Sequence, residues 1–362
     1  MDLTINKLVH KLIKDIYLDS SGKIKEEFKY KINISELKIQ DSKFTPNPGD
    51  KFETMLFLPP NSNRIAEGGL RTKGLFKFSY KKVKSDFEEN KNNASENDGI
   101  WYICDLDGNP AIPAPDDLQE KIKQYTSNLL PTTFLPLITI ITVVYNGAKY
   151  LEDTIKSVIN QTYPNVEYII IDGGSTDGTI DIIKKYEDYI DYWVSEPDKG
   201  IYDAMNKGIV VASGQWINFL GSDDIILSNA VSNILKYLNK KNIAVYGNVI
   251  MKTTNKVYDG KFNYFKLFFK RNICHQSIFY NAKVIRRYSF NLKYNILADY
   301  ALNLAIFIDK YFIYTPYIIA IYNDKGKSSN IVDYNFKKDK IKLLFSHIFN
   351  IVKLRKILND SI

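Results

Sequence analysis

Between residues 137 and 250, near-continuous apolar runs alternate with stretches in which apolar residues recur at helical spacing. The apolar runs are 138–145, 166–171, 190–195, 215–221 and 243–250, and the helical stretches are about 149–160, 176–186, 201–212 and 228–239. Strands that are apolar on both faces and alternate with helices are typical of a mostly parallel sheet. We therefore expect an α/β fold with helices on both faces of the sheet.

Residues 1 to about 134 follow a different pattern. Strand-like runs at 53–58, 75–80 and 100–104 are separated by turn-forming residues, and proline-rich connectors follow at 110–117 and 129–136. We expect a boundary between residues 131 and 136. This divides the chain into a β-rich accessory domain (1–134), an α/β domain (135–330) and a basic amphipathic helical tail (331–362).

Targeting and membrane-spanning segments are not evident in the sequence. The first 20 residues have helical periodicity with lysines among the apolar positions, which is unlike a secretory signal. The longest apolar stretch, 302–322, is interrupted by Asp309, Lys310 and Pro316. We expect a cytoplasmic protein, with peripheral contact at the inner face of the plasma membrane as an open alternative.

Polar side chains follow three of the predicted strands, where ligands bind in open α/β sheets. An aspartate in such a place is often a turn former or a helix N-cap, and for Asp172 this interpretation stands beside a functional one. Neighbouring carboxylates repel each other unless a cation offsets them, so a pair is more informative. Hard oxygen ligands suit Mg²⁺ or Mn²⁺, with substrate phosphates completing the coordination. The residues concerned are Tyr145, Asn146, Asp172, Ser222, Asp223 and Asp224.

The loop after the first of these strands excludes two common nucleotide-binding classes. It reads YNGAKY (145–150) and contains neither GxGxxG nor GxxxxGK[ST]. A Rossmann dehydrogenase and a P-loop NTPase are both disfavoured. We expect an enzyme that binds a nucleotide diphosphate through a metal ion.

Three blocks of sequence resemble a known family. ITVVYNGAKYLEDTIKSVINQTYPNVEYIIIDGGSTDGT, SEPDKGIYDAMNKGI and ASGQWINFLGSDD, in this order, resemble the family 2 glycosyltransferases of bacterial surface-polysaccharide synthesis. The resemblance is close over 137–224 and looser to about 330. It implies a glycosyltransferase-A fold, a nucleotide-sugar donor (a UDP-sugar by preference), a divalent metal and inversion at the anomeric carbon.

The resemblance assigns roles to the residues at the strand ends. Tyr145 matches an aromatic residue that packs on the base, Asp223 a residue that touches the ribose and a metal-bound water, and Asp224 the metal ligand. Asp172 matches the carboxylate that ends the second strand. Two positions depart from the family: Gly173 stands where many members have the aspartate that meets uracil, and Ser222 stands at the first position of the longer DxD motif.

The block from 195 to 208 has two interpretations. As structure, its apolar residues pack a helix and Asp198 caps it. As function, which the resemblance favours, four polar residues line the groove for the nucleotide and the sugar. These are Asp198, Lys199, Asp203 and Asn206.

The acceptor side supplies a candidate general base. Asp299, in YNILADYALNLAIF, matches an acidic residue that serves as base in the family, while a helix N-terminal aspartate is the alternative. His275, in NICHQSIFY, is a candidate metal or phosphate contact by resemblance, although a lone histidine is more often structural. In YNDKGKSSN, Lys325 and residues 327–329 resemble a loop that closes over the diphosphate, or form a solvated turn.

The positive charge changes the choice of partner. The formal net charge is +8, and two segments, 262–272 and 335–358, combine basic with aromatic or apolar residues. No nucleic-acid reading module is present, so we expect contact with anionic lipid, or a solvated basic helix. In AEGGLRTKG (66–74), a turn between strands is more plausible than a phosphate site at Arg71 and Lys73.

Together these features predict an inverting, metal-dependent hexosyl- or N-acetylhexosaminyl-transferase that acts on a glycan or a lipid-linked acceptor. The alternatives are a non-catalytic glycan- or nucleotide-binding relative and a sugar nucleotidyltransferase. The latter would need a glycine-rich phosphate loop, which YNGAKY is not.

Overall fold

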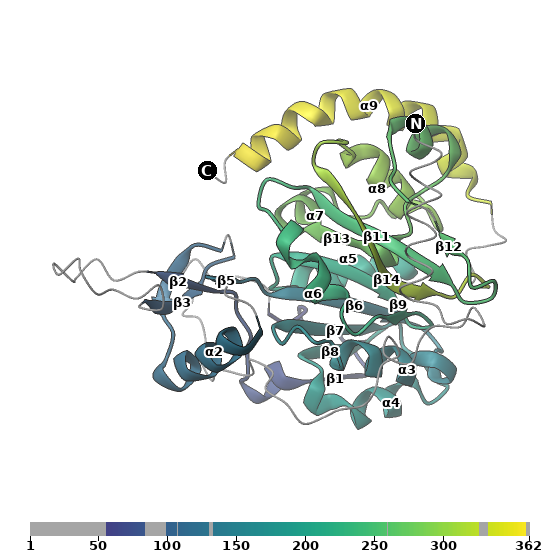
Figure 1. Ribbon diagram of the computed structural model, residues 1–362. Coiled ribbons are helices and arrows are strands. Elements are labelled where there is room, and N and C mark those ends of the chain that lie inside the picture. The colour runs from purple at the N-terminus through teal and green to yellow at the C-terminus, as the bar shows by residue number, and fades with distance from the viewer. Residues whose placement is uncertain are drawn as a thin grey trace, which may run out of the picture.

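The structure is a computed structural model that describes residues 56–83, 99–106, 108–129, 133–258, 260–325 and 332–359. The helix predicted within the first 20 residues and loop residues 327–329 lie outside this range. Of the strand predicted at 53–58, only residues 56–58 are described, and they do not form a strand. Figure 1 shows an α/β body crossed by a long C-terminal helix, with a smaller lobe beside it.

The α/β body is built on a ten-stranded sheet. Its strand order is β1-β8-β7-β6-β9-β13-β11-β14-β10, and β12 pairs with β11. The strands are β1 (Ala66–Gly68), β6 (Ile138–Val144), β7 (Val166–Asp172), β8 (Tyr192–Ser195), β9 (Trp216–Gly221), β10 (Ile225–Ile226), β11 (Ala244–Met251), β12 (Val257–Tyr258), β13 (Ile278–Asn281) and β14 (Phe312–Tyr322).

The predicted parallel arrangement describes the centre of this sheet. Strands β8, β7, β6 and β9 pair in parallel. Beyond β9 the sheet is mixed, because β13 runs antiparallel to both β9 and β11. The register places Val144 opposite Asp172 and Val143 opposite Gly221, so β6, β7 and β9 end at one rim. The polar residues that follow these strands are thereby gathered at that rim.

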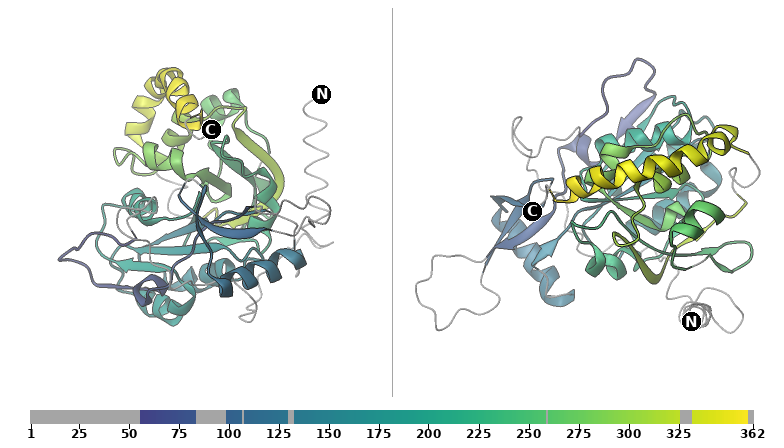
Figure 2. Two further views of the ribbon diagram at one scale, coloured as in Figure 1. Left: turned by 90° about the vertical axis from the view of Figure 1, so that its left-hand side faces the viewer. Right: turned by 90° about the horizontal axis from the view of Figure 1, so that it is seen from above.

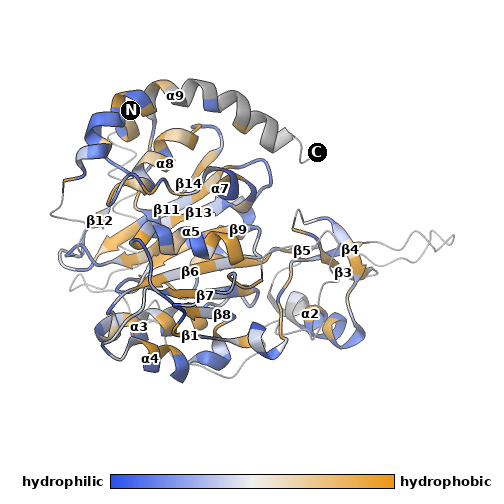
Figure 3. Cartoon of the chain, turned by 180° about the vertical axis from the view of Figure 1, so that it is seen from behind, coloured by the Kyte–Doolittle hydropathy of each residue, from blue (hydrophilic) through white to orange (hydrophobic). Residues whose placement is uncertain are grey.

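Helices cover both faces of the sheet, as predicted. Successive residues of β7 point to opposite faces: Tyr168 and Ile170 belong to one buried apolar cluster, and Ile169 and Ile171 to the other. The strands of the sheet are accordingly among the most hydrophobic parts of the chain (Figure 3). The helices of the body are α3 (Ala148–Ile159), α4 (Thr179–Lys185), α5 (Ile201–Val211), α6 (Ala230–Ile234), α7 (Ala282–Tyr288) and α8 (Ala298–Ile306).

The smaller lobe is a four-stranded antiparallel sheet with one helix. Its order is β4-β3-β2-β5. The elements are β2 (Tyr80–Val83), β3 (Ile100–Cys104), β4 (Pro110–Pro113), β5 (Phe134–Leu135) and α2 (Asp116–Leu129). The run predicted at 100–104 coincides with β3, whereas the run predicted at 75–80 reaches the ladder only at Tyr80. The division of the chain at 134/135 stays a prediction.

Residues 56–78 precede this lobe in the chain but contact the large sheet. β1 pairs with β8, and Arg71 lies in a 3₁₀ turn (Leu70–Lys73) where only 3% of it is exposed. Its guanidinium donates to Glu167 at 2.5 Å and to the carbonyl oxygens of Leu56 and Val211 at 2.7 and 2.8 Å. Arg71 therefore holds the chain in place, in agreement with the turn rather than with a phosphate site.

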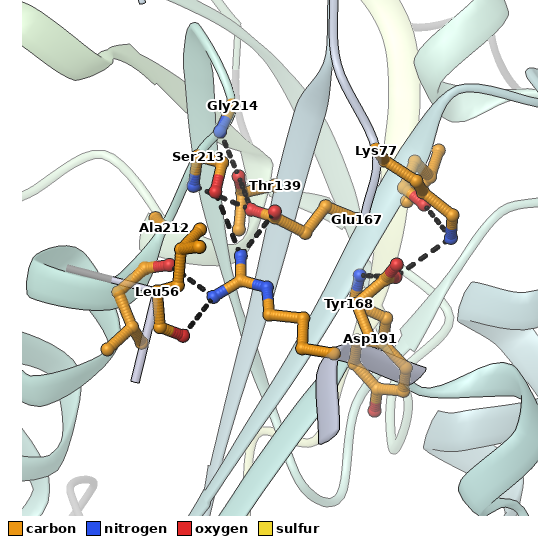
Figure 4. A network of polar contacts seen from close by, with 12 residues as sticks. Leu56, Lys77, Thr139, Glu167, Tyr168, Asp191, Ala212, Ser213 and Gly214 are labelled. Atoms are coloured by element: carbon orange, nitrogen blue, oxygen red, sulfur yellow. Dashed lines mark hydrogen bonds and ion pairs between the residues drawn. The ribbon is translucent and has the colours of Figure 1, made fainter. Parts of the chain in front are cut away.

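A second buried ion pair strengthens the same attachment. Lys77 Nζ lies 2.8 Å from Asp191 and 2.9 Å from the carbonyl oxygen of Val166. Figure 4 shows both clusters, with Glu167 and Thr139 on one side and Lys77, Asp191 and Tyr168 on the other. Lys77, in the run predicted as a strand at 75–80, thus contacts the large sheet. This explains why most of that run is not part of the small sheet.

The C-terminal segment forms the helix α9 (Tyr334–Asn359), which lies along α8. Near its start, Phe336 packs against Tyr300 of α8 with ring centroids 4.9 Å apart. The two views of Figure 2 show α9 crossing the body from two further directions. Among the described helices, none combines the length and the hydrophobicity needed to cross a membrane.

Candidate active site

The carboxylate pair Asp223 and Asp224 follows β9 at the rim of the sheet. Only 1% of Asp224 is exposed. Thr154 of α3 donates its hydroxyl to the carbonyl oxygens of Ser222 and Asp224 at 2.9 and 2.8 Å, which fixes the loop. The amide of Gln276 donates to Asp224 Oδ2 at 2.6 Å. The loop is therefore held from two sides.

Asn323 completes the surroundings of the pair from the end of β14. Its backbone N–H donates to Asp224 Oδ1 at 2.7 Å, and its side-chain amide donates to Asp223 Oδ2 at 2.8 Å. Burial and the neighbouring Asp223 raise the pKa of Asp224 to about 6. Within the described part of the chain, neither carboxylate forms an ion pair with a lysine or an arginine.

The donor set fits a hard divalent cation. Two adjacent carboxylates offer oxygen ligands, and their mutual repulsion, which adds to burial in raising the pKa of Asp224, would be relieved by positive charge. The described residues contain no group of three or more His, Cys, Asp and Glu arranged to hold a metal ion. The structure thus does not gather His275 into one cluster with Asp223 and Asp224.

Asp299 lies in the first turn of α8, and 8% of it is exposed. The hydroxyl of Tyr202 donates to Oδ1 at 2.9 Å, and the amide of Asn272 donates to Oδ2 at 2.7 Å. His275 Nδ1 lies 3.7 Å from Oδ2. The carboxylate is oriented by neutral donors. His275 lies beside it and is also close enough to Asp224 to act on it electrostatically.

One short segment, 272–277, contacts both carboxylate sites. Asn272 and His275 face Asp299, and Gln276 binds Asp224. The segment leads directly into β13, which lies between β9 and β11. Asp224, which follows β9, and Asp299, which begins α8, are therefore both contacted by the single turn that precedes β13.

A second part of the rim is formed by the loops after β6, β7 and β8. Tyr145 is 58% exposed. A Cβ built on Gly173 would lie 3.4 Å from the Tyr145 ring and 2.5 Å from Asp198 Oδ2, so both side chains flank Gly173. A Cβ built on Gly147 would lie 3.4 Å from Ser222 Oγ, which connects this part of the rim to the carboxylate loop.

Asp172 is fully buried and serves the turn that follows it. It accepts hydrogen bonds from the backbone N–H groups of Gly174 and Ser175 at 3.1 and 2.9 Å, and from the hydroxyls of Ser175 and Ser195 at 2.5 and 2.6 Å. This corresponds to the turn-forming interpretation. Direct contact with a nucleotide stays a prediction for Asp172, whereas its shaping of the Gly173 loop is visible in these contacts.

The four polar residues at the start of α5 divide into two kinds. Asn206 uses both ends of its amide on the backbone of Phe290, at 2.8 Å each, and Asp203 accepts the backbone N–H of Lys199 at 3.0 Å. Asp198 Oδ1 accepts the N–H of Gly200 at 2.7 Å. Lys199 is exposed at the rim. Asn206 thus fastens α5 to the chain before α8. Contact of Asp198, Lys199, Asp203 and Asn206 with a ligand stays a prediction.

Sequence reasoning missed several residues that position the carboxylates. Gln276 stands beside His275 in NICHQSIFY, and Asn323 is the second residue of YNDKGKSSN. Tyr202 lies within the helix predicted at 201–212 and is not among the predicted site residues. The sequence signal for such residues is a polar side chain beside a predicted site residue. The carboxylates that they bind lie 52 to 100 residues away, so the sequence does not identify these partners.

Comparison with known proteins finds matches over the part of the chain that contains the three sequence blocks. The family described as "Glycosyl transferase family 2" matches residues 139–310. A "PGL/p-HBAD biosynthesis glycosyltransferase" of Mycobacterium bovis is 36% identical over 213 residues, which cover 56% of this chain and 83% of that protein. The "Putative teichuronic acid biosynthesis glycosyltransferase TuaG" of Bacillus subtilis is 37% identical over 116 residues, covering 31% of this chain and 46% of that protein.

Solved structures with partial likeness include TarS 1-349 of S. aureus in complex with UDP-GlcNAc. Its TM-score is 0.49 at 17% identity, over 62% of this chain and 71% of that one. The mannosyltransferase PcManGT of Pyrobaculum calidifontis, in complex with GDP-Man and Mn2+, has a TM-score of 0.45 at 17% identity, over 62% of this chain and 74% of that one. At these scores the likeness is too weak to assign a donor or a metal. The sequence relatives are decisive, and they show that the chain belongs to glycosyltransferase family 2.

Proposed function

We propose that this glycosyltransferase is an inverting, metal-dependent enzyme that transfers a hexosyl or N-acetylhexosaminyl group from a UDP-sugar to a hydroxyl of a glycan or lipid-linked acceptor in surface-polysaccharide synthesis. The observation that carries the proposal is the turn at 272–277, which contacts Asp224 through Gln276 and Asp299 through Asn272. A group suited to the leaving diphosphate and a group suited to the attacking hydroxyl are thereby held by one element.

In this proposal Asp224, with Asp223, holds Mn²⁺ or Mg²⁺. A divalent ion bound there supplies a Lewis acid for the charge that develops on the departing diphosphate. Gln276 and Asn323 orient the two carboxylates through their hydrogen bonds. Asp224 is buried and lies next to the half-buried Asp223, and two like charges in such a place are costly without a ligand, which supports a site that is completed together with its donor substrate.

Asp299 is the proposed general base. An ionised carboxylate has about four acceptor positions, and Tyr202 and Asn272 use two of them. The remaining capacity accepts the proton of the acceptor hydroxyl while its oxygen bonds to the anomeric carbon and the bond to the diphosphate oxygen breaks. Tyr202 and Asn272 are positioning residues that fix the direction of the carboxylate, and such a base contributes roughly 10²- to 10⁴-fold to the rate.

An exposed aromatic and basic patch supports a lipid-linked acceptor. Phe265 immediately precedes the π-helical turn η5 (Lys266–Lys270), and Phe269 lies within it. The two rings are 60% and 64% exposed, and their centroids are 5.4 Å apart. We define the membrane patch as these two phenylalanines with Lys266 and Lys270. Aromatic rings flanked by lysines suit the interface of an anionic bilayer.

The membrane patch adjoins the acceptor side of the site through Tyr300. This residue follows Asp299, its hydroxyl donates to the carbonyl oxygen of Leu267 at 2.5 Å, and its ring packs on Phe336 of α9. Ile341 and Phe345 of α9 are also exposed, at 69% and 63%. Contact of these surfaces with the inner face of the plasma membrane would bring a lipid-linked hydroxyl toward Asp299.

The test is a thermal-shift screen of nucleotide sugars with and without Mn²⁺, followed by transfer assays with the donor that stabilises the protein most. Wild type should be stabilised by a UDP-sugar only when the ion is present. Asp299→Asn should keep this stabilisation and lose transfer, whereas Asp309→Asn, a change of an exposed carboxylate beyond α8, should keep both. Failure of every nucleotide sugar to stabilise the wild type would overturn the proposal, and normal turnover by Asp299→Asn would remove Asp299 as the base.

A further inference from the structure

The carboxylate of Asp198 occupies space that a side chain at position 173 would fill. A Cβ at Gly173 would lie 2.5 Å from Asp198 Oδ2 and 3.2 Å from its Cγ. Gly173 is not among the glycines with positive φ, so its backbone is open to other residues. The absence of a side chain at 173 therefore serves the approach of Asp198 and not the turn itself.

The two oxygens of Asp198 are differently engaged. Oδ1 accepts the N–H of Gly200 at 2.7 Å, which fixes the direction of the carboxylate. Among the described residues, no hydrogen-bond donor meets Oδ2, which lies next to Gly173, as does the Tyr145 ring. Asp198 is half-buried, and burial raises its pKa, because the charged carboxylate is partly removed from water.

The ring of Tyr145 offers a platform beside this oxygen. It is 58% exposed at the end of β6, where a planar ligand can stack on it, as bases do on exposed aromatic side chains. Ile65, 56% exposed, lies 3.4 Å from a Cβ built on the next residue, Gly174, and adds an apolar wall. The aromatic ring, the apolar side chain and the carboxylate oxygen together offer contacts to a flat group with an N–H at its edge.

We propose that Asp198 reads the base of the nucleotide donor, with Oδ2 accepting the ring N–H of uracil stacked on Tyr145. Uracil presents an N–H donor at ring position 3, whereas cytosine presents a nitrogen lone pair there, which repels a carboxylate. The inference rests on the proposed function, because it concerns the donor of the same reaction. It identifies a specificity-determining residue and accounts for a glycine at position 173.

The geometry predicts that the two positions are exchangeable. Because the carboxylate of Asp198 and a side chain at 173 compete for one volume, Gly173→Asp should be tolerated once Asp198 is shortened to glycine. The carboxylate would then approach the same place from the β7 side. Gly173→Ala alone should push the Asp198 carboxylate aside and weaken base reading while Asp198 is still present.

The test measures binding of UDP, CDP and GDP by calorimetry in the presence of Mn²⁺. Asp198→Ala should weaken UDP binding about 10- to 100-fold, the range for a hydrogen bond to a charged group, and should leave CDP binding unchanged or stronger. Gly173→Ala should act in the same direction, and the Gly173→Asp/Asp198→Gly exchange should restore the preference for UDP. Asp181→Ala, which removes an exposed carboxylate from α4, is the control and should bind as wild type does.

The outcomes separate this inference from the proposed function. If wild type binds no nucleoside diphosphate, both are overturned. If wild type binds UDP and Asp198→Ala binds UDP equally well, or loses UDP and CDP in equal measure, the base-reading role fails while the proposed function stands. A wild type that prefers GDP or CDP to UDP would likewise contradict it. Melting temperatures of all variants show whether a loss of binding is a loss of folding.

Discussion

Removal of the Arg71 guanidinium should destabilise the whole α/β body. The buried Glu167 would keep its hydrogen bonds from Thr139 and Ser213 but lose its only ion-pair partner among the described residues. Leaving a buried charge unpaired in this way costs roughly 3–5 kcal/mol. At roughly 2–4 °C per kcal/mol for domains of this size class, Arg71→Ala should lower Tm by about 6–20 °C.

The assay is thermal and urea unfolding followed by circular dichroism. Lys73→Ala is the matched control, because Lys73 stands in the same turn and forms an exposed pair with Asp188, which contributes little. The double variant Arg71→Met/Glu167→Gln should recover much of the loss, since neither of these two positions then buries a charge. If Arg71→Ala lowers Tm no more than Lys73→Ala does, the N-terminal segment is held by other contacts and the reasoning is refuted.

The same ion pair predicts an acid limit to stability. Burial raises the pKa of Glu167, but Arg71 and the hydrogen-bond donors outweigh it, so the pKa in the folded protein lies below its ordinary value. A carboxylate with a lowered folded pKa stabilises the protein above the unfolded pKa of about 4.3, and this stabilisation is lost as the pH falls further. Wild type should therefore lose stability below about pH 4, and Glu167→Gln should lose less over that range.

Three further predictions concern the site and the membrane. Asp224→Ala should abolish Mn²⁺-dependent stabilisation by UDP in a thermal-shift assay, and unchanged stabilisation would exclude its metal role. Asp172→Ala leaves the Gly173 turn without its acceptor and should lower the free energy of unfolding by about 1–3 kcal/mol, with weaker UDP binding; an unaltered urea midpoint would show that the turn forms without it. Phe265→Ser/Phe269→Ser should reduce sedimentation with phosphatidylserine vesicles several-fold but not change transfer to a soluble acceptor, and equal sedimentation would end the membrane-patch hypothesis.

The sequence was sufficient for the central strands because their apolar runs are long and rich in β-branched residues. The predicted limits of β6 and β7 are within one residue of those in the structure. Strand direction was not accessible at β13, whose four buried residues give the same pattern in either orientation. The mixed half of the sheet therefore had to come from the structure.

The sequence predicts candidate site residues only where a local pattern indicates them. The position after a strand and the resemblance to family blocks indicate Asp224 and Asp299, but the hydrogen-bond donors that orient these carboxylates come from distant segments. The ion pair of Arg71 with Glu167 spans 96 positions, and the proximity of Asp198 to Gly173 joins two loops that look independent in the sequence. Such pairings depend on which strands are neighbours, which residue patterns alone do not specify.

The ends of the two sheets have a consequence for self-association. The large sheet ends on β1, of three residues, and β10, of two, while the small sheet ends on the two-residue β5 and on β4, which begins and ends with proline. Short or proline-bearing edge strands are poor templates for pairing with another chain. Within the described residues, both sheets therefore end on short strands, and addition of a further strand at β8, or at the segment of β14 that pairs with β10, should first require loss of β1 or of β10.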